Sequence, residues 1–428
     1  MWHLGLVNAV GFASKKYHVT GIDLNKETIK KLQKGTLPLF EPGLTEAVAM
    51  YTKKKLLTFS DQLMSISDSE YVIIAYDTPI KKNNEVDIAP IIETCKRIAV
   101  YLRPEALVII TSQIPLGTSE TIEALIRKEN PTWSGEVVYT PENLRLGSAI
   151  KGFLHPDMLV FGVHSENAKK LVTELYHPFI TEKIFMDIRS AEMVKHTLNA
   201  FLATSIAFGN EIANLCDRLG ADGVKVMSAL RHDKRVGFAP IFPGLGFSGG
   251  TLARDVRQLK KLARQTQYPA PLIQSVRTIN EDTFEQIILK LKNRLKTIPG
   301  KNIGLLGLTY KPNTSTLRQS PSLKLAQLLG KSDAHCFGYD PQANNEEFQT
   351  LASFIKRVSS VEKLAAVSDA LVLVTEWPEF QTLDFPKLAH LMKTPILIDA
   401  KNFLDPIILG KSGFTYEGYG RGRKERVA

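Results

Sequence analysis

Lys195 and Asn199 stand four residues apart in the segment EMVKHTLNAF. A helix brings residues at this spacing onto one face, so the ammonium and the amide would lie side by side. A cation beside an amide can neutralise a developing alkoxide, which is the chemistry of an oxyanion site. Taken alone, such a pair is more commonly part of a solvated helix face, because most charged side chains are exposed.

A second candidate region is the glycine-rich segment PGLGFSGGTLARD, which runs from Pro243 to Asp255. Its glycines, Gly246 and Gly249 among them, allow backbone N–H groups to face anionic oxygens. The same composition also fits a plain flexible loop. Asp255 precedes the helical pattern DVRQLKKLAR, so an N-cap is one interpretation of this residue.

Asp23 follows the apolar run HVTGI and would lie at the end of a strand. A carboxylate there can accept hydrogen bonds from both hydroxyls of an adenosine ribose, which favours NAD over its 2′-phosphorylated form. An isolated Asp at a strand end is also a common turn residue. The preceding segment resembles a phosphate-binding turn that runs into a helix, with Gly5 as the third glycine of GxGxxG and Trp2 in the place of the second.

The first strand and first glycine of that pattern are absent from the sequence. The backbone cannot approach a pyrophosphate as closely past an indole as past glycine. Either the chain is truncated or its cofactor site is altered. Truncation is the favoured hypothesis, because loss of a central parallel strand would leave buried backbone groups unpaired.

The elements that would position these residues form an α/β pattern. Short apolar runs alternate with helical patterns in the first third, which predicts a parallel sheet covered on both faces. A long helical stretch starts near Ala191 and has Gly220 as its stop signal, a length that suits a spine between domains or a dimer surface. Strand-like runs then return near Gly300. The predicted domains are 1–188, 189–298 and 299–428, the first and last being Rossmann-like.

Composition narrows the functional classes. The chain has 428 residues, 44% of them hydrophobic, and a scattered net charge of +10 without an aromatic-basic motif, so we expect no nucleic-acid partner. The cysteines, Cys95, Cys216 and Cys336, form no CxxC pair, which is typical of a reduced compartment, and we expect no metal site. No apolar run is long enough to span a membrane, so the expectation is a soluble cytoplasmic protein.

Several motifs occur in an order that resembles the UDP-glucose/GDP-mannose dehydrogenase family, and the likeness covers nearly the whole chain. The motifs are GTLPLFEPGL, TPENLRLGSAI, EMVKHTLNAFLA, GFSGGTLARD, GLTYKPNTSTLRQSPS and LVTEWPEF. The resemblance implies two Rossmann-like domains joined by a long central helix, a helical dimerisation region and a homodimer. It also implies NAD in the first domain and a nucleotide sugar between the domains. Such enzymes oxidise a sugar C6 hydroxyl twice.

The resemblance also implies roles for individual residues. Lys195 and Asn199 match the residues that stabilise oxyanions and position the sugar. Asp255 matches an aspartate that orders a water or serves as base, and Glu142 matches a general acid/base; alone, Glu142 would be a surface carboxylate. The implied cofactor contacts are Gly5, Asp23, Thr78, Gln113 and Arg318. The implied substrate contacts are Arg235, which reaches the sugar across the dimer, Gly246, Phe247, Gly249, Lys311 and Lys401.

The sequence departs from the family pattern at the second oxidation step. The family's nucleophilic cysteine is replaced by Thr251, whose alkyl hydroxyl needs a strong base before it can attack, and the motif holds no histidine. Further departures are Gln113 for a threonine, Leu146 for an acid, Gly250 for a serine, Ala253 and Arg254 for a proline and a lysine, and Lys401 for an arginine. Most of these positions fall in the predicted active site.

Three hypotheses follow. The first is an NAD-dependent dehydrogenase of a UDP-glucose-like substrate that uses Lys195, Asn199 and Asp255 and stops at the aldehyde, or oxidises its hydrate slowly. The second is a non-catalytic member that binds a nucleotide sugar or serves as a subunit partner. The third, a hydroxy-acid or β-hydroxyacid dehydrogenase, leaves the second α/β domain unexplained. UDP-N-acetylhexosamines and GDP-mannose stay open as substrates.

Overall fold

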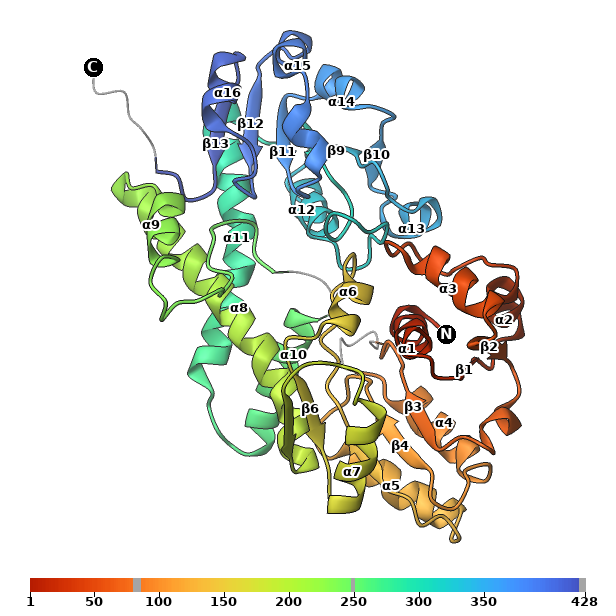
Figure 1. The fold of residues 1–428 in the computed structure, drawn as a ribbon. Coiled ribbons are helices and arrows are strands. Elements are labelled where there is room, and N and C mark those ends of the chain that lie inside the picture. The colour runs from red at the N-terminus through yellow and green to blue at the C-terminus, as the bar shows by residue number, and fades with distance from the viewer. Residues whose placement is uncertain (80–85, 248–250, 423–428) are drawn as a thin grey trace. The chain divides into compact units, whose positions relative to one another are not determined.

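The computed structural model describes residues 1–79, 86–247 and 251–422. These divide into two compact units, residues 1–198 and 199–428. Helix α8 (Ile188–Leu219) passes from the first unit into the second as one uninterrupted element (Figure 1). Gly220, the predicted stop, follows it with φ at +73°, a conformation that glycine adopts without strain. The three predicted domain ranges stay a prediction.

The first unit contains a five-stranded sheet and a separate two-stranded ladder (Figure 1). The sheet has the order β3-β4-β5-β6-β7, and only β5 and β6 pair antiparallel. The ladder pairs two strands in parallel, with Ile22 opposite Ser60. The strands are β1 (Val19–Ile22), β2 (Leu57–Ser60), β3 (Tyr71–Ile74), β4 (Leu107–Ile110), β5 (Val137–Tyr139), β6 (Leu159–Gly162) and β7 (Lys183–Met186). The predicted missing strand concerns residues before Met1 and stays a prediction.

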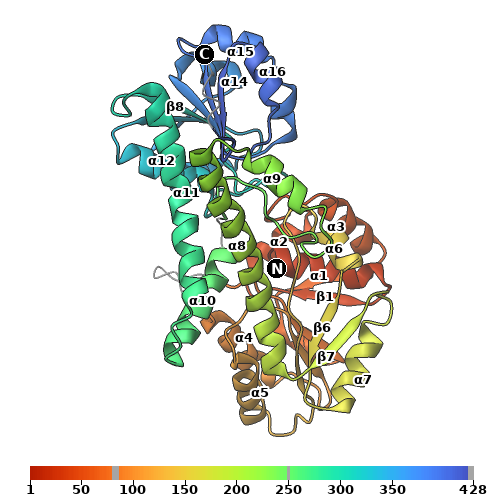
Figure 2. The ribbon, with the colours of Figure 1, turned by 90° about the vertical axis from the view of Figure 1, so that its left-hand side faces the viewer.

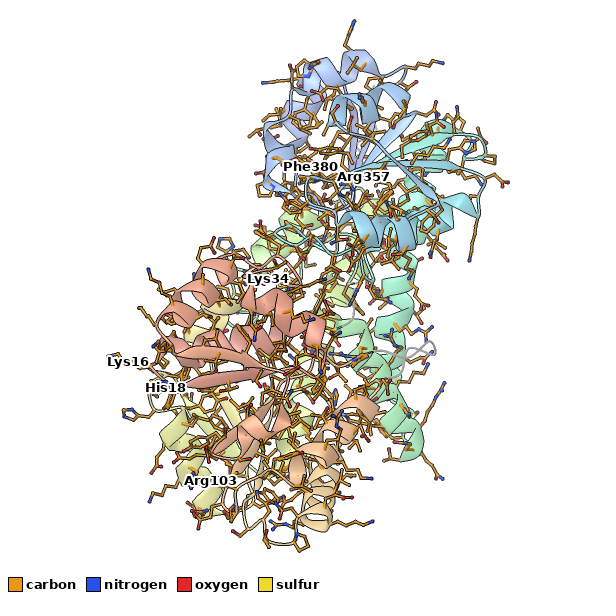
Figure 3. All side chains as sticks on the ribbon, turned by 90° about the vertical axis from the view of Figure 1, so that its right-hand side faces the viewer. Lys16, His18, Lys34, Arg103, Arg357 and Phe380 are labelled. Carbon is orange, nitrogen blue, oxygen red and sulfur yellow. The ribbon has the colours of Figure 1, made fainter. Side chains whose placement is uncertain are left out.

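Helices cover both faces of this five-stranded sheet, and its interior strand β4 is apolar on both sides. In β4, Leu107 and Ile109 face one hydrophobic cluster, and Val108 and Ile110 face the other. The helices of the unit are α1 (His3–Ser14), α2 (Lys26–Gln33), α3 (Leu44–Lys53), α4 (Ala89–Ala99), α5 (Thr118–Glu129), α6 (Ala149–Leu154) and α7 (Glu166–Leu175). Exposed side chains such as Lys16 and His18 lie at the outer edge (Figure 3).

The second unit combines long helices with an all-parallel six-stranded sheet. Its strand order, β10-β9-β8-β11-β12-β13, is the 3-2-1-4-5-6 order of the doubly wound dinucleotide-binding fold. The fold class predicted from the sequence is therefore confirmed. The strands are β8 (Asn302–Leu306), β9 (His335–Tyr339), β10 (Ile355–Arg357), β11 (Ala370–Leu373), β12 (Ile396–Asp399) and β13 (Thr415–Gly418).

In this unit α8 and α11 run side by side (Figures 1 and 2) and pack through apolar side chains. The six-stranded sheet buries one cluster on each face, and alternation in β11 sends Val372 to one and Leu371 to the other. Helices of the unit are α9 (Gly223–Leu230), α10 (Leu252–Gln265), α11 (Pro271–Leu295), α12 (Pro321–Gly330), α13 (Asn345–Leu351), α14 (Val361–Val367), α15 (Phe385–Leu391) and α16 (Pro406–Lys411). Within the described residues, not one helix has the length and apolar character that crossing a membrane requires.

Candidate active site

The Lys195 side chain is buried, with only 5% of the residue exposed. Its Nζ donates to the backbone carbonyl of Glu142 and, at 3.3 Å, to Oδ1 of Asn143. These acceptors follow β5, so α8 brings the ammonium to the carboxyl end of the parallel sheet. The solvated-face interpretation of this residue is therefore wrong.

Asn199 lies one helical turn further along α8 and is equally buried. Its Nδ2 donates to Oδ2 of Asp255 over 2.5 Å, and Asp255 is completely buried. Helix α10 begins at Leu252, three residues before Asp255, so the interpretation of Asp255 as an N-cap is wrong. The carboxylate instead sits inside the first turn of α10, and its contact with Asn199 joins α10 to α8.

Glu142 is partly buried in the loop after β5. Its Oε1 accepts a hydrogen bond from the backbone N–H of Leu144. Burial raises the pKa of the Glu142 carboxyl above its ordinary value, and the nearby Lys195 ammonium opposes this effect without cancelling it. A carboxyl with a raised pKa can exchange a proton closer to neutral pH, as a general acid/base must.

Thr251 is exposed and stands at the N-cap position of α10, where its side chain makes no capping hydrogen bond. Its backbone carbonyl accepts from the N–H of Asp255 at 3.1 Å. The cysteines offer no replacement nucleophile, because each is buried. Burial raises the pKa of Cys95 to about 12 and that of Cys336 to about 11, and it also raises the pKa of Cys216.

Groups suited to a dinucleotide gather at the carboxyl ends of β1 and β3. Asp23 follows β1, and its carboxylate contacts the ammonium of Met1 and accepts from the N–H of Asn25. At the first turn of α1, the N–H of Leu4 donates to Oδ2 of Asp77 at 2.9 Å. This turn thus holds an anionic oxygen, as a pyrophosphate site requires, and Asp23 is placed for a ribose; the residues fit NAD.

Gly5 and Thr78 lie near the same strand ends. A Cβ on Gly5 would stand 3.5 Å from the carbonyl oxygen of Ala75, so the glycine permits close packing of helix on strand. Thr78 Oγ1 donates to the backbone carbonyl of Gln113 at 2.7 Å, and both residues are buried. The structure therefore brings Thr78 and Gln113, two of the predicted cofactor residues, together.

The predicted substrate residues of the second unit, and the predicted cofactor residue Arg318, are more dispersed. Lys401 follows β12 and pairs with Glu376, whose carboxylate lies 3.2 Å away, after β11. Arg318 pairs with Glu347 at 3.0 Å, and Lys311 is partly buried in the loop after β8. Arg235 is exposed and forms a 2.6 Å pair with its neighbour Asp233; its predicted role across a dimer stays a prediction. Gly249 lies outside the described residues.

Asp340 is an organising residue that the sequence analysis missed. It follows β9, the counterpart of the strand that carries Asp23. Its buried Oδ2 accepts from the backbone N–H groups of Leu308 and Thr309, from the Thr309 hydroxyl and from Trp377 Nε1, all within 3.1 Å. A carboxylate with this many donors holds together the loops that follow β8, β9 and β11. The place of Asp340 after a strand in AHCFGYDP was the available signal.

Gly246 and Phe247 end the described part of the glycine-rich segment. The backbone N–H of Phe247 donates to Asn280 Oδ1 at 2.7 Å, and Asn280 Nδ2 donates back to the Phe247 carbonyl at 2.9 Å. The flexible-loop interpretation is therefore wrong for these two residues.

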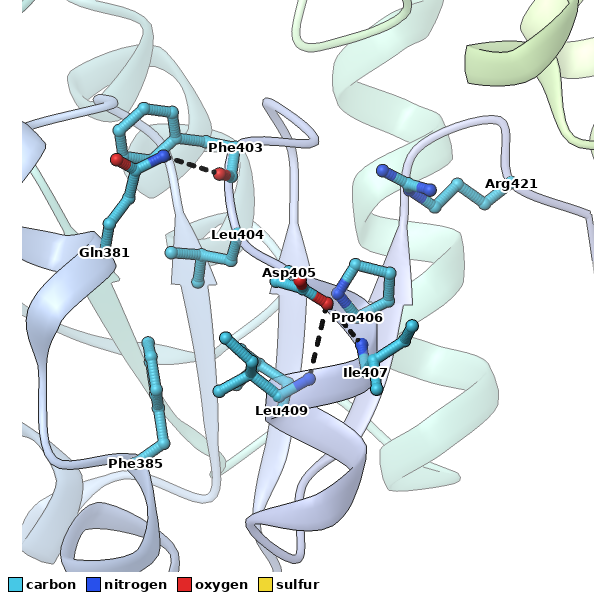
Figure 4. Close-up of a pocket in the computed structure, with 10 residues that line it drawn as sticks. Gln381, Phe385, Phe403, Leu404, Asp405, Pro406, Ile407, Leu409 and Arg421 are labelled. Atoms are coloured by element: carbon cyan, nitrogen blue, oxygen red, sulfur yellow. Dashed lines mark hydrogen bonds between the residues drawn. The ribbon is translucent and has the colours of Figure 1, made fainter.

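A pocket of about 500 Å³ opens at the rim of the six-stranded sheet (Figure 4). It is lined mainly by apolar side chains from Phe385, Leu404 and α16, with Arg421 at one side. None of the predicted site residues lines it. The pocket borders the loop after β12, because Phe403 and Leu404 follow Lys401 in that loop, but neither Lys401 nor Asp340 lines it.

Family models match the chain in three consecutive stretches. The NAD binding domain of the UDP-glucose/GDP-mannose dehydrogenase family matches residues 2–180, its central domain matches 189–282, and its UDP binding domain matches 304–406. Together with the mostly parallel sheet of the first unit, the parallel six-stranded sheet of the second and the buried residues Lys195 and Asn199 on α8, these matches define an NAD-dependent dehydrogenase of the nucleotide-sugar class. The chain belongs to the UDP-glucose/GDP-mannose dehydrogenase family.

Curated relatives match along almost their full length. UDP-glucose 6-dehydrogenase of Rhizobium meliloti strain 1021 is 35% identical over 427 residues, covering 98% of both chains. UDP-glucose 6-dehydrogenase TuaD of Bacillus subtilis strain 168 is 33% identical over 421 residues, covering 98% of this chain and 91% of the relative. Among solved structures, a UDP-glucose dehydrogenase from Pyrobaculum islandicum superposes with a TM-score of 0.90 at 28% identity, covering 98% of this chain and 96% of the other.

Proposed function

We propose that the protein oxidises the C6 hydroxyl of a nucleotide sugar with NAD, and that UDP-glucose is the first substrate to test. The observation that carries this proposal is the buried pair Asn199–Asp255, one helical turn from buried Lys195. Burial of the Asn199 amide, the Asp255 carboxylate and the Lys195 ammonium costs free energy, because each group must be desolvated. This cost favours a functional role for the three groups. The UDP-glucose 6-dehydrogenases among the relatives support the choice of substrate.

The three groups suit the first oxidation. Asp255 can order a water or accept the hydroxyl proton, and the Lys195 ammonium can stabilise the developing alkoxide. Asn199, held by Asp255, can orient the sugar. NAD would be held by Asp23 and the first turn of α1, beside Thr78, and supplies the hydride acceptor when bound.

At the second oxidation step, the residues of this chain depart from the family pattern. A covalent route needs an activated nucleophile, but Thr251 has only a hydroxyl and the buried thiols have raised pKa values. We therefore propose that the enzyme stops at the aldehyde, or oxidises the aldehyde hydrate slowly with Glu142 activating a water. A non-catalytic nucleotide-sugar-binding protein is the second candidate, favoured by the place of Thr251 at the expected nucleophile position.

The deciding experiment is the number of NADH molecules formed per molecule of limiting substrate, across a panel of UDP- and GDP-sugars. One NADH supports an enzyme that stops at the aldehyde. Two NADH would contradict that stop and point to Glu142 and bound water. No NADH with any sugar, together with measurable binding of a UDP-sugar by calorimetry, would favour the non-catalytic candidate.

We also propose a homodimer that uses α8. In the second unit, Phe201, Phe208 and Leu215 recur at intervals of seven residues on this helix, and each is exposed by 45% or more. Residues seven apart lie on one helix face, so the three form an apolar stripe. Aromatic and aliphatic stripes of this kind are typical of subunit interfaces, where burial stabilises the association.

A further inference from the structure

The contact between Asn280 and Phe247 has an unusual form. Asn280 lies in the middle of α11, is 8% exposed, and uses its side-chain amide to accept from the N–H and donate to the carbonyl of a single residue. The amide thus replaces the partner that a neighbouring strand would supply. Both backbone groups of Phe247 are satisfied by one side chain, so the backbone there has a single preferred orientation.

Gly246 shows how closely the segment approaches Asn280. A Cβ on Gly246 would stand 2.1 Å from Asn280 Oδ1 and 3.2 Å from Thr283 Oγ1. Any side chain at this position would displace the Asn280 amide. The glycine is therefore required for the contact rather than for flexibility, since its backbone does not adopt a positive φ.

The residues just before Gly246 are anchored as well. The N–H of Gly244 donates to Asn210 Oδ1 at 3.0 Å, and the N–H of Leu245 donates to the Ala400 carbonyl at 2.5 Å. Asn402 Nδ2 donates to the carbonyl of Pro243 at 3.1 Å. Helix α8, helix α11 and the turn after β12 therefore hold successive backbone groups, and Asn280 makes the contacts at the end of the described part of this segment.

Phe247 passes this constraint to the catalytic pair. Its side chain is 7% exposed and belongs to a cluster with Ala203 and Ala207 of α8 and Val256 of α10. Val256 is the neighbour of Asp255, whose carboxylate meets Asn199. A shift of Phe247 would therefore move the first turn of α10, and a displacement of about 1 Å at a catalytic group can reduce a rate about 100-fold.

We propose that Asn280 is a positioning residue that fixes the backbone of Gly246 and Phe247 and, through Phe247 and Val256, sets the place of Asp255 against Asn199. The part that concerns catalysis rests on the proposed function, whereas the structural part does not. Asn280 itself need not touch the sugar or NAD. Its effect on the reaction passes through α10.

The test compares the unmodified protein with four variants and one control. Asn280→Asp keeps the shape of the side chain but places a carboxylate oxygen against the Phe247 carbonyl. Asn280→Ala removes the side chain, Gly246→Ala introduces the clash, and the double variant joins the last two changes. Asn293→Asp is the matched control, because Asn293 is exposed on the same helix.

Hydrogen exchange at the Phe247 amide is the first readout, because it needs no substrate. We expect exchange to be at least about ten-fold faster in Asn280→Ala, which removes the acceptor of the Phe247 N–H, and unchanged in Asn293→Asp. Gly246→Ala should have a large effect alone and a small one when Asn280 is already Ala, since the clashing oxygen is then absent. Unchanged exchange at Phe247, or additive effects in the double variant, would overturn the proposal.

Kinetics separate positioning from simple stabilisation. In the Asn280 variants, kcat with UDP-glucose should fall at least about ten-fold while the KM for NAD changes by less than about two-fold. Faster exchange with an unaltered kcat would show that Asn280 only stabilises the fold, which contradicts the positioning role. If the unmodified protein oxidises no sugar, the proposed function fails, and the exchange data still decide whether Asn280 holds the segment.

Discussion

The amide of Asn199 and the carboxylate of Asp255 meet over 2.5 Å in a site that excludes solvent from both residues. The two residues are far apart in the sequence and come from different helices, α8 and α10. A hydrogen bond to a buried carboxylate contributes about 1.5 to 3 kcal/mol, and loss of either partner leaves the other unsatisfied. The pair is therefore both a structural joint and the centre of the proposed chemistry.

Replacement of Asn199 by Asp should reduce kcat about 100-fold at neutral pH, because a second ionised carboxylate would face Asp255 and could not donate the hydrogen bond that the amide supplies. At acid pH one of the two carboxyl groups would hold a proton and could donate again, so part of the activity should return. The pH dependence of kcat measures this effect. Asn293→Asp, an exposed change of the same kind, serves as control; equal pH profiles for both variants would refute the pairing.

The acid limb of the pH–rate profile for the second oxidation, measured with the aldehyde as substrate, should reflect Glu142, because this residue is proposed to activate water in that step. Burial raises the pKa of this carboxyl, and a general base works only when it is ionised, so the rate should fall with decreasing pH at a value above about 4.3, the ordinary pKa of Glu. In Glu142→Gln this limb should disappear, and kcat should drop about 100-fold or more. Glu105→Gln, at an exposed site, should leave the profile intact. An acid limb that persists in Glu142→Gln would assign it to another group.

Replacement of Thr251 by Cys should raise the NADH yield per molecule of UDP-glucose from one toward two. A thiol near the ordinary pKa of about 8.5 is a far better nucleophile for an aldehyde than an alkyl hydroxyl. The yield is read at complete consumption of limiting substrate. Thr251→Ser is the matched control and should keep a yield of one. A yield that stays at one in Thr251→Cys would show that the missing thiol is not what stops the reaction.

Glu41 should stabilise the first unit. Its buried carboxylate contacts His3 Nε2 at 2.9 Å and accepts from the N–H groups of Gly147 and Ala149, each at 2.8 Å. Glu41→Gln places an amide N–H against one of these donors, so the free energy of unfolding should fall by about 2 kcal/mol at pH 7. Chemical denaturation measures the loss, with the exposed Glu27→Gln as control.

The pH dependence of the stability lost in Glu41→Gln follows from the direction in which the pKa of Glu41 is shifted. Burial acts to raise the pKa of Glu41, but the hydrogen bonds from His3 and the two backbone amides outweigh it, and the pKa lies below its ordinary value. The stabilisation is thus complete above about pH 4.3, the ordinary value, and disappears as pH falls through the lowered pKa. The difference between the protein and Glu41→Gln should narrow only in that acid range; a constant difference would contradict the assignment.

Replacement of Phe208 by Glu should weaken the proposed dimer about ten-fold or more, because a charge would enter the apolar stripe on α8. Sedimentation or light scattering over a concentration series measures the dissociation constant. Phe354→Glu changes an aromatic residue of comparable exposure, 41% against 45%, in the second unit outside α8. A monomer at all concentrations, or equal effects of the two substitutions, would exclude the stripe as the interface.

The sequence predicted most of the fold because buried strands and long helices leave regular patterns. The runs that became β3, β4, β8 and β11 are apolar and bounded by turn residues, and α8 ends at the predicted glycine. Strands such as β10, with the sequence IKR, were missed because two of their three residues are exposed and give no apolar run. Short edge strands depend on their neighbours for their conformation.

The site was predicted only in part, for a physical reason. Lys195 and Asn199 could be paired from helical spacing, since both lie on one element. The contacts of Asp255 with Asn199, of Asn280 with Phe247 and of Asp340 with Trp377 join residues from separate elements, and no local pattern encodes them. Burial could not be foreseen either, because Lys195 and Asn199 alone resemble an exposed pair.

Helix α8 also fixes the spacing and the direction of the side chains that it carries. It carries Lys195, Asn199 and the anchor Asn210 on a continuous 32-residue element, together with the outward-facing Phe208. Each residue adds about 1.5 Å of rise and about 100° of rotation. One inserted residue between Phe201 and Phe208 would turn the rest of the helix by that angle, moving Phe208 out of line with Phe201 and Asn210 away from Gly244. A side chain on this helix can therefore be replaced without moving its neighbours, whereas a change in the length of the helix changes the direction of every residue after it.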